Sequence, residues 1–405
     1  MRLTRRELLL GSAALPLLAA EKAPPPRPSV LLILVDGLGA HMLGCYGNRV
    51  IRTPNVDVLC RSGARFVRSF VATPEPAASR ATLLSGLTPR QLAERPGQAP
   101  LLSDVLAAAG YDCGYCGAWD LGAGPDHGIK FWERSPEPAA ASAKALEFLD
   151  GRKPGQPFFL TVSYQLPVMA APQYRALYRG VSLDPIGWEP AAPNATAGKG
   201  ILSDLEAAMR GAAASVTAVD DEVQRLIKKL DARGLRDDTL IVFTATCGEM
   251  LGRHGLWGDG RASDPPNMFD EVVGVPMIWQ WGRRVPPESV RPEVGRSFDV
   301  LPTVCALAGA NPPAGPAPGR SYAPAVLNER FPKKNPWVDL AFGEFGKIRM
   351  VRDKTYKLVL REGGPNELYD VEHDPREQVN QYANDQFLVV RNGLTQDLNG
   401  WSKQF

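Results

Sequence analysis

The stretch PEPAASRATLLSG, Pro74–Gly86, decides how the rest of the chain is interpreted. It follows an apolar run, Phe66–Val71, that is typical of a strand, and its own pattern predicts a helix that ends at Gly86 in a left-handed conformation. Ser79 is the expected N-cap, because a serine hydroxyl can accept a backbone N–H of the first turn. A helix N-terminus favours anions, and Arg80 adds a planar set of donors. The stretch therefore predicts either an ordinary Ser-capped helix or an anion site at Ser79 and Arg80.

Continuous apolar runs elsewhere predict a buried sheet. Residues 29–35, 157–164 and 239–245 have the length of strands and the composition of strands covered on both faces. A long amphipathic helix is expected over 202–235, and residues 345–351, 356–361 and 367–371 alternate as antiparallel strands do. The pattern predicts an α/β fold, with a large mixed, mostly parallel sheet sandwiched by helices and a small C-terminal antiparallel-sheet subdomain. We expect a main domain over 29–320 and an α+β subdomain over 335–405.

The first 20 residues have the pattern of an export signal. They combine a basic start, an apolar centre and small residues at the end. Arg5 and Arg6 resemble a twin-arginine signal, although a general secretory signal with incidental arginines is the alternative. Residues 21–28 are expected to be a linker. The chain is therefore predicted to be exported by a bacterium to the periplasm or beyond, and it has no later apolar run long enough to span a membrane.

Composition excludes some classes of partner. The net charge of +2 over 405 residues does not favour nucleic acid. Six cysteines are present, and Cys113 and Cys116 form a CxxC within a strand-like run. A zinc site or redox motif would need further ligands or a helix start, so these two residues are predicted to be buried thiols.

The central stretch resembles the signature of the sulfatase family, within the alkaline phosphatase superfamily. The matching positions are Ala78, Ser79, Arg80, Leu84, Ser85 and Gly86. The segments CYGN (45–48), TPNVDVLCRSGARF (53–66), HGLWG (254–258), MFDEVVGVP (268–276) and RMVRDKTYKLVL (349–360) extend the resemblance over about residues 28–380. The resemblance implies hydrolysis of sulfate esters by a formylglycine, made from a Cys or Ser, together with a calcium ion.

Several positions depart from this pattern. The position of the nucleophile holds Pro76, which has no nucleophilic atom and cannot become formylglycine. Of the calcium ligands that the resemblance implies, only Asp36 is retained. The other departures are Gly37, Ala118, Asp120, Val168, Thr246, Cys247 and Asp259. Because calcium needs six to eight oxygen ligands, we expect no cofactor and a catalytically inactive or strongly impaired protein.

Three functions remain open from the sequence. The first is an exported non-catalytic protein that binds an anionic or sulfated small molecule or glycan through Ser79, Arg80 and Arg261. The second is an active sulfate- or phosphate-ester hydrolase in which Asp36, Asp120, Cys247 and Asp259 hold a softer metal such as zinc. Thr73, Glu75 or Ser79 would then act on the substrate or on water. The third is a structural or regulatory partner of an active sulfatase.

Overall fold

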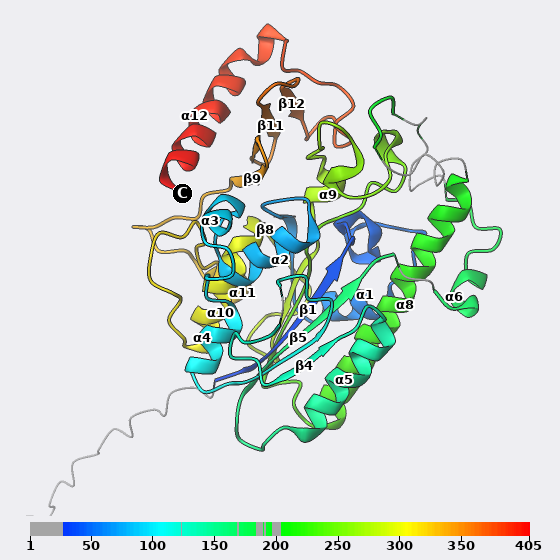
Figure 1. The fold of residues 1–405 in the computed structure, drawn as a ribbon, viewed down its shortest axis with the longest axis vertical. Helices are drawn as coiled ribbons and strands as arrows, with labels where there is room; N and C mark the ends of the chain where they lie inside the picture. Colours follow the sequence, from blue (N-terminus) through cyan, green and yellow to red (C-terminus); the bar gives the residue numbers. More distant parts are fainter. Residues whose placement is uncertain (1–26, 123, 168–169, 184–188, 190–191, 197–203) are drawn as a thin grey trace, which may run out of the picture.

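The computed structural model describes residues 27–122, 124–167, 170–183, 189, 192–196 and 204–405. The predicted signal and almost all of the linker lie outside the described residues, as does Val168. A twisted sheet occupies the centre with helices on both sides, and the C-terminal subdomain lies at one end (Figure 1). Within the described ranges, no helix has the length and apolar character needed to cross a membrane.

The central sheet has eight strands in the order β4-β3-β5-β1-β6-β7-β2-β8. All neighbouring strands are parallel except that β7 runs antiparallel to β6 and to β2. The predicted mixed, mostly parallel sheet is therefore confirmed. The strands are β1 (Ser29–Asp36), β2 (Ala64–Phe70), β3 (Asp112–Gly117), β4 (Phe131–Arg134), β5 (Phe158–Gln165), β6 (Thr239–Ala245), β7 (Met277–Gln280) and β8 (Ser289–Arg296).

Alternating side chains of β1 supply two separate cores. Leu31, Ile33 and Val35 pack on one face, while Val30, Leu32 and Leu34 pack on the other. Helices cover both faces, because a strand that is apolar throughout must be shielded on both sides. One face carries α1 (Pro54–Arg61), α5 (Pro138–Gly151) and α8 (Leu205–Ala232), and the other carries α2 (Pro76–Ser85), α4 (Leu102–Ala108), α10 (Val300–Ala308) and α11 (Ala323–Val326).

The C-terminal subdomain is a second, smaller sheet. The predicted antiparallel sheet is confirmed, with four strands in the order β12-β11-β10-β9, and α12 (Leu388–Gln404) packs against it. Trp401 of this helix stacks on Phe342 with ring centroids 4.8 Å apart. The strands are β9 (Ala341–Phe345), β10 (Ile348–Arg352), β11 (Tyr356–Arg361) and β12 (Glu367–Asp370).

The CxxC lies on β3, and its two thiols are on opposite faces of the sheet. Cys113 belongs to one core and Cys116 to the other, and both are fully buried. Burial raises the pKa of each thiol to about 12. The prediction of two buried thiols is confirmed.

Candidate functional site

Asp36 stands at the carboxyl end of β1, where ligands of open α/β sheets gather. Its side chain is buried and already has two partners. One oxygen accepts a hydrogen bond from the hydroxyl of Thr246, 2.5 Å away, and the other faces the Nη2 of Arg80, also at 2.5 Å. Burial raises the pKa of Asp36, while Arg80 and Thr246 oppose that shift. Asp36 is therefore held by the protein's own groups.

Gly37 occupies the place of the second carboxylate that the resemblance implies. Its φ is +75°, a conformation that residues with a side chain rarely adopt. A Cβ there would also lie 3.1 Å from the carbonyl oxygen of Leu166. The backbone at this position is built for glycine, so an aspartate could not be introduced without strain.

The start of α2 differs from the prediction. The helix begins at Pro76, one residue after its N-cap, Glu75. The Glu75 carboxylate accepts hydrogen bonds from the N–H groups of Ala77 and Ala78, at 3.2 and 2.8 Å. Ser79 is inside the first turn, since its own N–H donates to the carbonyl of Glu75. The prediction of Ser79 as N-cap is wrong, because proline at the first helical position and glutamate before it fix an earlier start.

This cap changes the chemistry expected at the helix N-terminus. Two N–H groups that could have met an external anion are bonded to the carboxylate of Glu75. The hydroxyl of Ser79 is buried and has no hydrogen-bond partner among the described residues. The predicted closing residue Gly86 is confirmed, with a left-handed φ of 73°.

Arg80 extends from α2 toward the carboxyl end of β1 and is fully buried. Besides Asp36, its guanidinium donates to the hydroxyl of Ser163 at 3.3 Å, to the carboxylate of Asp120 at 3.1 Å and to the carbonyl of Trp119 at 3.2 Å. Burial opposes its charge, but Tyr115, Asp36 and Asp120 together raise the pKa of Arg80 above its usual value. Arg80 is a charged group whose donors are directed at the protein itself.

Arg261 is paired with Asp259. Its backbone N–H and Nε donate to one oxygen of Asp259 at 2.9 and 3.0 Å, and its Nη2 lies 2.6 Å from the other. A longer contact of 3.7 Å joins Arg261 to Glu75. The Arg261 side chain is 59% exposed, in contrast with Arg80. Asp259, by accepting these bonds, raises the pKa of Arg261.

Cys247 is buried in the interior, near Asp36 and Asp259. It is 1% exposed, and burial, together with the nearby charges of Asp36 and Asp259, raises the pKa of its thiol. Asp36 lies near Asp120 and Cys247, and Cys247 lies near Asp259, so their charges influence one another. However, the described part of the chain contains no group of three or more His, Cys, Asp or Glu side chains arranged to hold a metal ion. The three carboxylates face arginines instead.

Two further features were not predicted from the sequence. Thr246 follows β6 and Ser163 lies within β5. Nothing in the sequence indicated that Thr246 would contact Asp36 or that Ser163 would contact Arg80. Glu75 was considered only as a reactive group, although the Glu-Pro pair before the helix was a usable signal for its capping role.

Comparison with known proteins places the fold in context. A family model described as Sulfatase matches residues 28–133 and 137–310, and one described as N-sulphoglucosamine sulphohydrolase, C-terminal, matches residues 252–404. The N-acetylglucosamine-6-O-sulfatase of Bacteroides thetaiotaomicron is 23% identical, over 98% of this chain and 91% of its own length. Human arylsulfatase A is 27% identical over 80% of this chain and 71% of its own length.

Solved structures are similar over nearly the whole chain. A protein in complex with its substrate D-glucosamine-2-N,6-O-disulfate has a TM-score of 0.80 at 21% identity, covering 93% of this chain and 98% of its own. The phosphonate monoester hydrolase of Agrobacterium radiobacter has a TM-score of 0.78 at 22% identity, with coverage of 93% and 96%. Given this shared fold and a sulfatase model that matches more than half of the residues, the chain belongs to the sulfatase family.

Proposed function

We propose that this sulfatase-family protein does not hydrolyse sulfate esters and instead acts as a binding protein for a sulfated saccharide or a related anion. The observation that carries the proposal is the pairing at the carboxyl end of β1. Pro76 stands where a nucleophile is needed, and Asp36 is bound by Arg80 and Thr246. Loss of one preorganised hydrogen-bond donor typically raises the activation free energy by about 2.7–4 kcal/mol. Without an attacking atom the reaction cannot begin.

Buried and exposed arginines have different roles in this proposal. Removing Arg80 from Asp36 would leave a buried carboxylate unpaired, which is strongly unfavourable. The Arg261 side chain is 59% exposed, so its guanidinium can meet a sulfate from solvent, while Asp259, 13% exposed, keeps the backbone N–H of Arg261. We therefore place anion recognition at Arg261 rather than at Ser79 and Arg80.

Turnover and binding assays test the proposal together. The full protein should release no 4-nitrophenol from 4-nitrophenyl sulfate or phosphate with calcium, with zinc or with chelator. Sulfated glucosamine fragments, titrated calorimetrically, should bind, and Arg261→Gln should weaken binding more than Arg376→Gln, an exposed arginine in the C-terminal subdomain. Binding that is insensitive to Arg261→Gln would contradict the assignment of the anion site.

A second candidate is a hydrolase with a rebuilt site. The feature that favours it is the proximity of Cys247 to Asp36 and Asp259, together with Glu249, whose pKa burial and Asp259 raise to about 8. A carboxyl that is protonated near neutral pH can serve as a general acid. Zinc bound at equimolar ratio, with turnover lost in Cys247→Ser, would favour this candidate over the first.

Export is also a proposal. Arg5 and Arg6 suggest the twin-arginine route, so replacing both with lysine should retain the full-length protein in the cytoplasm. Release of a processed protein to the periplasm in spite of that change would favour the general secretory route.

A further inference from the structure

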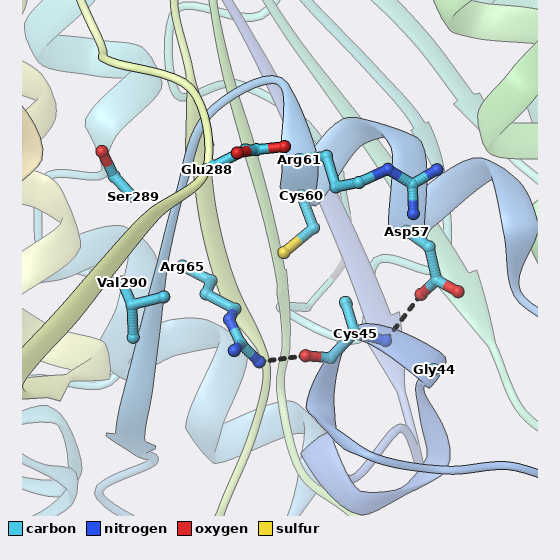
Figure 2. A pocket seen from close by; sticks show the side chains of 9 residues that line it. All are labelled: Gly44, Cys45, Asp57, Cys60, Arg61, Arg65, Glu288, Ser289 and Val290. Atoms are coloured by element: carbon cyan, nitrogen blue, oxygen red, sulfur yellow. Dashed lines mark hydrogen bonds between the residues drawn. The ribbon is translucent and has the colours of Figure 1, made fainter.

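A pair of cysteines lines a pocket that shares no residue with the Arg80 network. Cys45 and Cys60 border a cavity of about 340 Å³, together with Asp57, Arg61 and Arg65 (Figure 2). Cys45 belongs to the short 3-10 helix η2 (Gly44–Tyr46) and is half-buried, whereas Cys60 belongs to α1 and is 6% exposed. In Figure 2 the sulfur of Cys60 points into the pocket, on the side of Cys45 and Arg65.

The backbone holds the two cysteines together. The N–H of Gly44 donates to the hydroxyl of Thr53 at 2.9 Å, and the N–H of Cys45 donates to Asp57 at 2.7 Å. A Cβ on Gly44 would lie 2.3 Å from an oxygen of Asp57, so a larger residue there would displace the carboxylate that Cys45 bonds. Arg65 donates to the carbonyl of Cys45 from the other side. These contacts hold Cys45 and Cys60 in the lining of the same pocket.

The surroundings of the two thiols shift their pKa values in opposite directions. The neighbouring Cys45 thiol, with the cations of Arg65 and Arg61, lowers the pKa of Cys60, although burial and Asp57 oppose the shift. The neighbouring Cys60 thiol and burial raise the pKa of Cys45. Thiol–disulfide exchange needs one sulfur that attacks and a second that resolves the mixed disulfide, and the lower pKa suits Cys60 to the attack.

We propose that Cys45 and Cys60 form a redox-active dithiol that exchanges with small external disulfides. The Cys60 thiolate attacks one sulfur of the external disulfide, forming a mixed disulfide and releasing one thiolate, which takes up a proton. Cys45 then loses its proton and attacks the Cys60 sulfur of the mixed disulfide, releasing the second thiol. Overall, two protein thiols and one external disulfide give one protein disulfide and two external thiols. This site goes beyond the proposed binding function and is independent of it.

Oxidation would have a defined structural effect. The new bond would join η2 to α1 across the pocket, in addition to the hydrogen bonds that already connect them. The lining offers two cations, Arg61 and Arg65, and two carboxylates, Asp57 and Glu288, to a disulfide that carries both charges, such as glutathione disulfide.

Thiol counting and peptide mapping of the full protein test the proposal. Reduced protein is equilibrated with excess glutathione disulfide, quenched with acid, denatured and alkylated. The six cysteines should all be alkylated before oxidation, and two fewer afterwards. Trypsin cleaves after Arg49, Arg52 and Arg61, so Cys45 and Cys60 fall on different peptides and their link is seen directly. Cys113 and Cys116, buried on opposite faces of the sheet, serve as the internal control and should stay alkylated.

Variants separate the roles of the two sulfurs. In Cys45→Ser the mixed disulfide cannot resolve, so a glutathione adduct should accumulate on Cys60. Cys113→Ser should retain the link between Cys45 and Cys60. Complete alkylation of the oxidised wild-type protein would overturn the proposal, and so would a link that involves any other cysteine. Because the wild-type peptide map needs no substitution, the test holds even if a variant fails to fold.

Discussion

At the scale of single residues, the site is governed by a buried charge that is paired internally. Arg80 is fully buried and lies 2.5 Å from one oxygen of Asp36, and the hydroxyl of Thr246 donates a hydrogen bond to the other oxygen. A cation committed in this way stabilises the fold instead of a ligand, since removing either partner leaves an uncompensated charge in the interior.

Replacing Arg80 should therefore affect stability. We expect Arg80→Ala to lower the free energy of unfolding by about 3–5 kcal/mol, because Asp36 loses its cation. The double variant Arg80→Met with Asp36→Asn should recover much of this loss, since no charge is then left buried. Urea unfolding measures both. A loss below about 1 kcal/mol for Arg80→Ala would mean that Arg80 is free to serve a ligand.

His41 gives the protein a sensitivity to acid. Its Nε2 is shielded and has no partner among the described residues. Burial, with the charge of Arg253, lowers the pKa of His41 to about 4, although Glu271 opposes the shift. The unfolded chain then binds the proton more readily than the folded one between about pH 6.5 and 4, so stability falls as the pH falls through this range.

We expect wild-type protein to lose up to about 1.4 kcal/mol of stability per pH unit in that window relative to His41→Asn. Thermal or urea unfolding at several pH values measures the difference, and His373→Asn, at an exposed histidine, is the control. Parallel pH profiles for wild type and His41→Asn would contradict the assignment.

At the scale of elements, the N-terminus of α2 is closed by its own preceding residue. Glu75 satisfies two N–H groups and lies 3.7 Å from Arg261. One carboxylate therefore occupies the helix end and approaches the exposed cation, and its negative charge opposes binding of an anion there.

Removing this charge should improve anion binding at a cost in stability. Glu75→Ala should lower the free energy of unfolding by about 1 kcal/mol, as loss of an N-cap does, and should raise the affinity for inorganic sulfate. Calorimetric titration and urea unfolding measure the two effects, with Glu94→Ala at an exposed position as the control. Unchanged sulfate affinity would show that the capped end does not limit binding.

At the scale of the whole molecule, charged side chains join the C-terminal subdomain to helix α9 of the main domain. Lys357 of β11 is fully buried, 3.0 Å from Asp270 of α9 (Asp270–Val273) and 2.6 Å from Glu377. Arg352 of β10 also contacts Asp270 at 2.9 Å. The small sheet and α9 therefore share one charged network.

Breaking this network should weaken the whole protein. We expect Lys357→Met to lower the free energy of unfolding by about 3–5 kcal/mol, because the buried Glu377 loses its cation and Asp270 keeps only Arg352. Lys347→Met breaks an exposed pair with Glu362 on the same sheet and should change stability by less than about 1 kcal/mol. If urea unfolding gave the same loss of free energy for both substitutions, the claim that the buried Lys357 pair stabilises the protein more than the exposed Lys347 pair would be contradicted.

The sequence allowed the fold to be predicted further than the site. Residues 29–35 and 239–245 are apolar throughout, which indicates strands buried on both faces. These two strands pair with each other at the centre of the sheet. The contacts of Arg80 could not be predicted in the same way. They join residues 36, 80, 120 and 163, which come together only when three strands and a helix are placed. Ser79 was misassigned because a local preference of serine was outweighed by the Glu75-Pro76 start.

A crystal structure of the full protein grown with calcium and D-glucosamine-2-N,6-O-disulfate would show whether Asp36 stays paired with Arg80 or binds calcium. We expect Arg80 to remain on Asp36 and Asp120, no calcium at Asp36, and an intact sulfate near Arg261. A calcium ion bound to Asp36, with Arg80 turned onto the sulfate, would contradict a site closed by its own ion pairs.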